Sequence, residues 1–384
     1  MIIELMAAAL SSAAPVATID YAGDAKALDR LIVENYAYED HWPGGVLPDS
    51  PTLKREREAV HDRDSLKHYA EDRIASLADH HAITGSSFSD SWAIVPTYCD
   101  LWVVRRGDQF VIDAVRPDSP AATAGIVTGD GIDAIGGVPA VQAIGAFWQG
   151  LGLGVTDERA AYAARVLAAG RRDRPRDLTI VHGNTSRRVS LPSLYTLHSD
   201  RRAVSVDKTS DATVIRINNS LGDQATIAAF DQAMAAVDPR APLTIDLTDT
   251  PSGGNTSVAR AMMGWFVAAP TSYQVHQLPS EERETGIARQ WIEQVLPRSG
   301  KYHRGLPTIR VGRWTGSMGE GLAIGFAAIG SRVEGTAMAQ LKGAVYDIPL
   351  PSSGLVVKIP VERLYTVGGT PRERFIPRFQ KGNP

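Results

Sequence analysis

The chain has 384 residues, a formal net charge of −3 and one cysteine, Cys99. This length is sufficient for two or three domains with sizeable cores. The single cysteine excludes an internal disulfide and a cysteine-based metal cluster. Lysines and arginines are scattered, without the basic patch of a nucleic-acid-binding protein. No apolar run is long enough to span a bilayer, and no histidine spacing suggests a metal site, so we expect neither a metal nor a cofactor.

Residues 1–19 are rich in alanine and other small residues. Residues 5–17 resemble the apolar core of a signal peptide and end in small residues suited to cleavage. The positive charge that normally precedes such a core is missing, because Glu4 stands in that place. Two interpretations therefore stay open: a cleaved signal peptide on a periplasmic or secreted protein, or a disordered tail on a cytoplasmic one.

Residues 20–84 are predicted to form a helical cap. Residues 24–36 place apolar side chains at helical spacing, and residues 53–80 continue as a second, interrupted helix. The helical pattern ends just before His81. A histidine at the end of a helix can be a structural residue or a general base, and the local pattern alone does not decide between these roles.

Residues 85–192 are predicted to form a β-rich module. The pattern Ser-Pro-Ala-x-x-Ala-Gly-Ile at residues 119–126, a Gly-Asp turn at 129–130 and Ile-x-x-Ile-Gly-Gly at 132–137 together resemble a PDZ domain. This resemblance implies binding of an extended peptide, commonly a chain terminus, as an added strand at a sheet edge. Residues 145–170 form a Gly- and Ala-rich stretch that departs from a compact PDZ domain.

Residues 193–384 alternate strand and helix patterns, which predicts an α/β core. A strand at residues 243–247 leads to Gly253 and Gly254, and a helix follows. Two glycines at a helix start free the backbone to direct N–H groups at a developing negative oxygen. The same pair of residues would also suit an ordinary turn.

Ser317 lies between a short strand at residues 308–311 and a helix of small residues at 321–329. A serine at such a strand-to-helix turn is held clear of regular structure, and the backbone N–H groups at the helix start point outward. Gly316 and Gly319 would let a substrate approach closely. This arrangement favours a nucleophile, whereas the alternative is a serine that only caps the helix.

Taken together, these elements resemble the S41 family of serine peptidases, which includes the C-terminal processing, tricorn and retinoid-binding-protein-like peptidases. The resemblance covers residues 77–377 and implies a crotonase-like α/β fold built of ββα repeats. It implies that Ser317 is the nucleophile, that the backbone N–H of Gly253 or Gly254 is one oxyanion donor, and that the N–H of Met318 is the other. Its substrates would be polypeptides.

Two branches of this family use different general bases, and both have a candidate here. Lys342 follows Ser317 by 25 residues, which is the separation of the lysine-type branch, although the residues around Lys342 depart from that branch's motif. A desolvated lysine of lowered pKa could act as the base without a third residue.

The other branch uses a histidine before the PDZ module and a late glutamate. Asp79-His80-His81 resembles its Asp-Gly-His motif, with His80 in place of glycine, and Glu373 lies where the branch has its carboxylate. The resemblance thus favours a relay of Ser317, His81 and Glu373, in which the carboxylate orients the imidazole. Lys342 remains the alternative base.

The sequence therefore predicts a serine endopeptidase that acts through an acyl-enzyme, with the PDZ-like module engaging the substrate. Two other functions stay open. The chain could be a non-catalytic peptide-binding scaffold of the same fold, or it could use paired oxyanion donors on an acyl thioester, as other crotonase-like proteins do. The sequence gives no indication of the oligomeric state.

Overall fold

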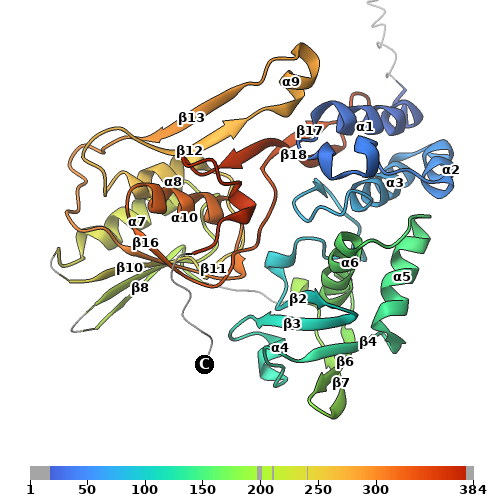
Figure 1. Ribbon diagram of the computed structural model, residues 1–384, viewed down its shortest axis with the longest axis horizontal. Helices are drawn as coiled ribbons and strands as arrows, with labels where there is room; N and C mark the ends of the chain where they lie inside the picture. Colours follow the sequence, from blue (N-terminus) through green and yellow to red (C-terminus); the bar gives the residue numbers. More distant parts are fainter. Residues whose placement is uncertain (1–17, 197–200, 210–211, 240, 378–384) are drawn as a thin grey trace, which may run out of the picture.

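The computed structural model describes residues 18–196, 201–209, 212–239 and 241–377. Of the signal peptide or tail predicted at residues 1–19, residues 1–17 lie outside this part of the chain. Figure 1 shows a helical cap and a small sheet module on one side and a larger α/β core on the other. None of the helices in the described ranges is both long and apolar enough to cross a membrane.

The cap contains three helices, α1 (Tyr21–Asn35), α2 (Pro51–Ala59) and α3 (Arg63–Ala75). The interruption predicted in residues 53–80 lies between α2 and α3, where the Asp62 side chain accepts the N–H of Ser65 and starts a new helix. Two short 3₁₀ turns, η1 (Glu39–His41) and η2 (Pro43–Gly45), connect α1 to α2. The cap packs its apolar side chains against strand β18 (Val356–Tyr365) of the core.

The sheet module is antiparallel, with strands in the order β2-β3-β4-β6-β7 and the short β5 paired to β4. Its strands are β2 (Leu101–Arg106), β3 (Gln109–Val115), β4 (Gly131–Ile135), β5 (Val138–Pro139), β6 (Arg176–His182) and β7 (Thr185–Leu191). Its helices are α4 (Pro120–Thr123), α5 (Ala140–Gly150) and α6 (Asp157–Ala169). The Gly- and Ala-rich stretch thus contains the end of α5 and all of α6, whose alanines pack in the module's core.

The core is built on a mainly parallel sheet in the order β16-β14-β10-β9-β8, in which only β8 is antiparallel to its neighbour. The strands are β8 (Val204–Lys208), β9 (Thr213–Ile217), β10 (Leu243–Asp246), β14 (Thr308–Val311) and β16 (Arg332–Gly335). The helices α7 (Ala225–Ala235), α8 (Thr256–Met263) and α10 (Met318–Ala328) cover one face and bury its apolar side chains.

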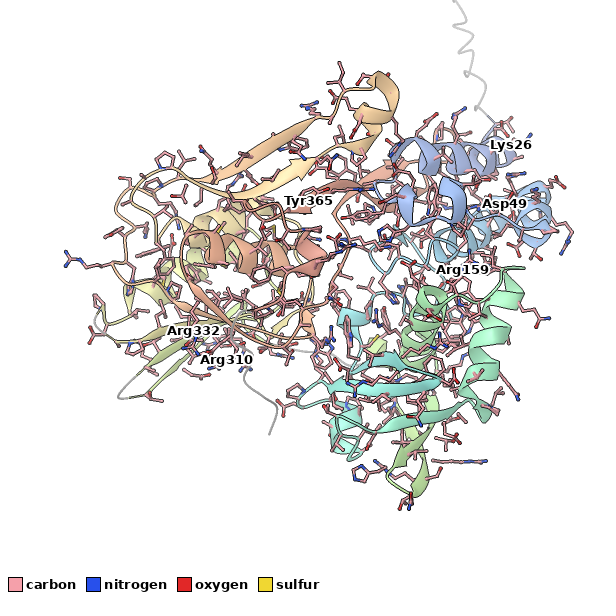
Figure 2. The ribbon with its side chains drawn as sticks, viewed as in Figure 1. Lys26, Asp49, Arg159, Arg310, Arg332 and Tyr365 are labelled. Carbon is pink, nitrogen blue, oxygen red and sulfur yellow. The ribbon has the colours of Figure 1, made fainter. Side chains whose placement is uncertain are left out.

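The opposite face of this sheet is polar because alternate side chains point away from the helices. Figure 2 shows Arg310 and Arg332 on that side. Arg332 pairs with Glu334 at 2.8 Å, and Arg310 lies 3.9 Å from Glu334. The strands of the core alternate apolar and polar residues because the apolar ones face the helices and the polar ones face away from them.

A second sheet, antiparallel throughout, joins the cap to the core. Its order is β1-β18-β12-β13, with β17 paired to β18. Its strands are β1 (Ile83–Thr84), β12 (Thr271–Gln277), β13 (Gln290–Val295), β17 (Ala344–Pro349) and β18 (Val356–Tyr365), and α9 (Pro279–Thr285) connects β12 to β13. Because Ile83 of β1 pairs with Lys358 of β18, the residues just before β1 lie against the core.

Two very short strands prepare the site. β11 (Asp249–Thr250) follows β10, and β15 (Trp314–Thr315) follows β14, and the two pair in parallel. They extend the chain beyond the carboxyl ends of the parallel strands, which is where open α/β sheets bind their ligands. The fold class predicted from the sequence, an α/β core with a β-rich module and a helical cap, is confirmed.

Candidate active site

Ser317 occupies a sharp turn between β15 and α10. Its backbone has φ 52° and ψ −117°, an uncommon conformation for a residue with a side chain. The preceding Gly316 is required here, because a Cβ at that position would lie 2.6 Å from the carbonyl oxygen of Pro251. The turn projects the Ser317 hydroxyl into a cavity of about 820 Å³.

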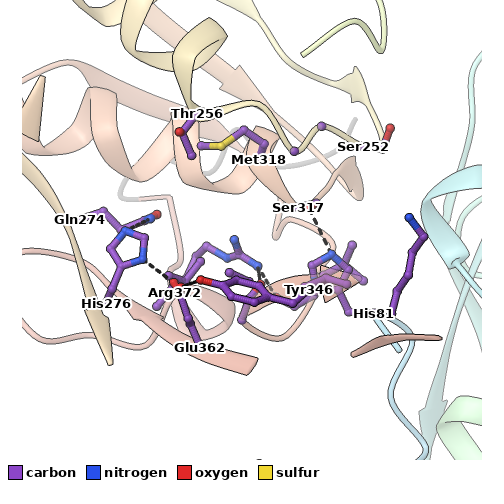
Figure 3. A pocket seen from close by; sticks show the side chains of 18 of the residues that line it. His81, Ser252, Thr256, Gln274, His276, Ser317, Met318, Tyr346, Glu362 and Arg372 are labelled. Atoms are coloured by element: carbon purple, nitrogen blue, oxygen red, sulfur yellow. Dashed lines mark hydrogen bonds and ion pairs between the residues drawn. The ribbon is translucent and has the colours of Figure 1, made fainter. Parts of the chain in front are cut away.

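His81 is the direct partner of this hydroxyl. Its Nε2 lies 3.1 Å from the Oγ of Ser317 (Figure 3). Its Nδ1 lies 2.6 Å from the carbonyl oxygen of Lys342. A carbonyl can only accept a hydrogen bond, so the proton of the neutral ring belongs on Nδ1. Nε2 is then free to accept the proton of the Ser317 hydroxyl.

Asp79 holds the backbone that carries His81. Its buried carboxylate accepts the N–H of His81 at 2.9 Å and the hydroxyl of Tyr36, from the cap, at 2.8 Å. The adjacent His80 points elsewhere: its Nδ1 contacts the carbonyl oxygen of Ile94 at 2.7 Å and its ring stacks on Tyr162. The two neighbouring histidines are therefore divided between the site and the interior of the protein.

The surroundings of His81 favour its neutral form. Burial lowers the pKa of His81 to about 4, and the positive charge of Arg372 acts in the same direction. The carbonyl of Lys342 and the carboxylate of Asp79 oppose this shift without cancelling it. At neutral pH the ring is consequently uncharged and able to accept a proton.

Glu320 connects the serine turn to the segment that contacts His81. Its fully buried carboxylate accepts the N–H of Ser317 at 3.0 Å and those of Gln340 and Leu341 at 2.8 and 3.2 Å. Burial raises the pKa of Glu320 to about 7, while Arg372 and the three N–H groups act against that rise. The sequence marks Glu320 as a charge in the first helical turn, but no sequence pattern reveals its three backbone partners.

Lys342 contributes its main chain to the site and not its amine. The Nζ of Lys342 lies 3.1 Å from the Oε1 of Glu158 on α6 and over the ring of Tyr38. Its side chain therefore points toward the sheet module and the cap, away from the hydroxyl of Ser317. The position of Lys342 in the sequence suggested a lysine base, but in the structure Lys342 presents its carbonyl oxygen to His81.

Glu373 is not hydrogen-bonded to His81 in the part of the chain that the structure describes. It lies in the 3₁₀ turn η5 (Arg372–Arg374), and its Oε2 is buried without a hydrogen-bond partner among the described residues. The Nδ1 position predicted for Glu373 is taken by the carbonyl of Lys342. The expected relay through this carboxylate is therefore not formed, because η5 directs Arg372 toward the site.

Gly253, Gly254 and Met318 line the same cavity as Ser317 and His81. The backbone at Gly253 lies directly against the start of α10, since a Cβ there would be 2.4 Å from the Cβ of Met318. Gly254 has φ 140°, which a residue with a side chain rarely adopts. The N–H of Met318 belongs to the first turn of α10, where amides have no acceptor within the helix.

The other end of the cavity contains a polar network that sequence reasoning missed. His276 on β12 contacts Glu362 through Nδ1 at 2.6 Å and Glu293 through Nε2 at 3.2 Å. Burial opposes its charge, but the two carboxylates outweigh burial and raise the pKa of His276 to about 9. The alternation of Gln274 and His276 along β12 would have placed both on one face of a strand.

No trio of His, Cys, Asp and Glu within the described ranges is arranged to hold a metal ion.

Comparisons with known proteins agree with this architecture. No family model matches the chain and no curated protein matches its sequence. Among solved structures, a photosystem II D1 C-terminal processing protease superimposes with a TM-score of 0.57 at 14% identity, over 95% of this chain and 94% of its own. Mature CPAF complexed with lactacystin also gives 0.57 at 14% identity, over 94% of this chain and 93% of its own. The chain therefore has the fold of the S41-type serine peptidases.

Proposed function

We propose that this protein is a serine endopeptidase that cleaves polypeptides through an acyl-enzyme intermediate. The observation that carries this proposal is the contact of 3.1 Å between the Oγ of Ser317 and the Nε2 of His81. A serine and a neutral imidazole at this separation form an activated nucleophile. The fold, which is shared with peptidases, supports the same conclusion.

In this mechanism the Oγ of Ser317 attacks the carbonyl carbon of the scissile peptide bond while the Nε2 of His81 takes the hydroxyl proton. The resulting oxyanion accepts the N–H groups of Met318 and of Gly253 or Gly254. The N–H of Ser317 is unavailable to the oxyanion because it donates to Glu320. This leaves Met318 as the donor at the start of α10.

The tetrahedral intermediate then collapses and the C–N bond breaks. The imidazolium of His81 returns its proton from Nε2 to the leaving amine, and the acyl group remains as an ester on Ser317. Water attacks this ester with His81 again as the base, which releases the carboxylic acid product and restores the hydroxyl. Throughout, the carbonyl of Lys342 keeps the proton on Nδ1 and the ring in place.

The β-rich module predicted at residues 85–192 is proposed to engage the polypeptide, as its resemblance to a PDZ domain implies. A second cavity, of about 350 Å³, lies between this module and the cap and is lined by Trp92, Phe147 and Arg172, among others. Ile83 and Val95 line both cavities, so the two adjoin. A polypeptide held in the second cavity would have a short path to Ser317.

One observation favours a second candidate function, that of a non-catalytic peptide-binding scaffold. The Nδ1 of His81 contacts a neutral carbonyl, so no carboxylate is hydrogen-bonded there to stabilise the imidazolium that catalysis requires. A protein of this kind would bind polypeptides in the same cavities and leave them intact.

The test of the proposed function is digestion of unfolded, fluorescently labelled casein by the purified wild-type chain. A peptidase should release internal fragments whose amount grows with time and with enzyme concentration, and mass spectrometry should identify cleavage within the chain. Binding of casein without any fragment would instead support the scaffold function.

Changing Lys342 to alanine is expected to leave kcat within about threefold of wild type, because only the main-chain carbonyl of Lys342 contacts His81. The lost pair with Glu158 should lower stability by about 1 kcal/mol or less. Initial rates of casein hydrolysis and a thermal melt measure both effects. A loss of a hundredfold or more, with His81 dispensable, would identify Lys342 as the base.

The activity is expected to persist into acidic solution. His81 must be neutral to accept a proton, so the acidic limb of kcat/KM that belongs to His81 should lie near the pKa of about 4 that burial gives it. Glu320, with a pKa raised to about 7 by burial, titrates in a separate range. Glu320→Gln removes that second titration, so the acidic limb retained in this variant belongs to His81. If the acidic limb of kcat/KM in Glu320→Gln lies near the ordinary pKa of histidine, the lowered pKa assigned to His81 is wrong.

A further inference from the structure

Arg372 is a buried cation held by main-chain carbonyls. The residue is 3% exposed, and its Nη2 donates to the carbonyl oxygens of Leu341 at 2.9 Å and Gly343 at 2.7 Å. No carboxylate within the described ranges forms an ion pair with it, and its Nε has no hydrogen-bond partner there. Burying a guanidinium is costly unless it is hydrogen-bonded or paired, so the two carbonyls that Arg372 binds are its compensating partners.

The two carbonyls that Arg372 binds flank the one that binds His81. The hydrogen bonds give the directions of these carbonyls: those of Leu341 and Gly343 face Arg372, while the carbonyl of Lys342 faces the Nδ1 of His81 at 2.6 Å. Any change in the direction of the outer carbonyls would turn the central one away from His81.

The segment is also fixed from its other side. Glu320 accepts the N–H groups of Gln340 and Leu341. The carboxylate of Glu320 thus holds the amides of the segment, while the guanidinium of Arg372 holds its carbonyls. Gly343 lies close to β18, since a Cβ there would be 2.1 Å from the carbonyl oxygen of Glu362. The segment has little freedom to adjust if one of these contacts is lost.

We propose that Arg372 is the positioning residue of the general base: by holding the carbonyls of Leu341 and Gly343, it directs the carbonyl of Lys342 at His81. This inference rests on the proposed serine–histidine chemistry and adds a residue to it. Arg372 thereby performs the orienting task that a carboxylate performs in a Ser–His–Asp triad. Unlike a carboxylate, it acts through the main chain and brings a positive charge.

That charge provides a signature that a merely structural residue would lack. The charged groups that act on His81 are Arg372 from η5 and Asp79 from the loop after α3, and Arg372 also acts on Glu320 of α10. Burial is the larger cause of the lowered pKa of His81, and Arg372 adds to it. Removing the charge should shift the acidic limb of kcat/KM to higher pH.

The test compares Arg372→Lys, which keeps the charge, with Arg372→Gln, which does not. Both lose the paired contacts to Leu341 and Gly343, so kcat should fall by about a hundredfold in each, with KM within about threefold of wild type. Only Arg372→Gln should shift the acidic limb upward. Arg176→Lys is the matched control, since Arg176 is equally buried but pairs with Asp100 in the sheet module; its kcat and acidic limb should remain those of wild type.

A second readout does not depend on hydrolysis. In the Ser317→Ala background, ¹⁵N chemical shifts of the His81 ring should show the proton on Nδ1 when Arg372 is present and a mixture of tautomers in Arg372→Gln. If the chain cleaves no peptide, the proposed function fails, while these shifts still decide whether Arg372 orients His81. A wild-type ring protonated on Nε2 would overturn the inference even if no Arg372 variant folds. Wild-type kcat in both variants would overturn it as well.

Discussion

Replacing Ser317 with alanine is expected to lower kcat for peptide hydrolysis by roughly a millionfold, the scale of loss when a serine peptidase loses its nucleophile. The reason is that Ser317 supplies the only hydroxyl within reach of the Nε2 of His81 among the described residues. The measurement is the initial rate of casein hydrolysis by purified protein, with substrate binding followed separately. Binding should persist, because the remaining lining of the cavity is intact.

The matched control for this variant is Ser331→Ala. Ser331 is buried just beyond the far end of α10, and its Oγ has no hydrogen-bond partner among the described residues. Its loss should change kcat by less than about twofold. A Ser317→Ala protein that cleaves casein at a rate comparable to this control would show that the hydroxyl takes no part in the reaction.

Replacing His81 with alanine is expected to cost nearly as much as the loss of Ser317, because the two residues act as one unit. Without the imidazole, the hydroxyl keeps its proton and the leaving amine has no acid. For the same reason, the double variant should be no less active than either single variant. Rates for the two single variants and the double variant, measured side by side, test this.

The adjacent histidine provides the control. His80→Gln removes a ring that stacks on Tyr162 and contacts the carbonyl of Ile94, so it should lower stability by about 1–3 kcal/mol and leave kcat near wild type. Equal losses of activity in the His80 and His81 variants would mean that the segment matters only for folding. Full activity without His81 would exclude it as the base.

The serine turn could be predicted from sequence because its determinants are local. The apolar strand, the glycines around Ser317 and the small residues of α10 lie within about two dozen positions of one another. Each favours the same strand-turn-helix unit, and the structure contains it. The paired turn at Gly253 and Gly254 could be predicted in the same way.

The contacts of the base could not be derived by such reasoning. His81 approaches Ser317 only because β1 pairs with β18, a long-range pairing between the cap and the core. The resemblance to a peptidase family supplied His81 as a candidate, but the partner of its Nδ1 is a main-chain carbonyl. Every residue has such a carbonyl, so no side-chain pattern could have identified Lys342 in this role.

At the C-terminal end of the site, the residue predicted from the sequence, Glu373, and the residue found there, Arg372, are neighbours in the chain. Glu373 and Arg372 are adjacent in η5, and it is Arg372 that lines the cavity of Ser317 and His81. The family resemblance favoured the carboxylate, whereas the fold buries the guanidinium against the carbonyls of Leu341 and Gly343. The conformation of such a short turn depends on packing against distant strands, which local propensity does not determine.

Covalent labelling with a fluorophosphonate tests directly whether Ser317 is a nucleophile activated by His81. One adduct per chain is expected, mapped by mass spectrometry to the peptide that contains Ser317. The adduct should form far more slowly in His81→Ala and at the wild-type rate in His80→Gln. An intact Ser317 after prolonged exposure, or labelling at the same rate without His81, would show that His81 does not activate Ser317 as a nucleophile.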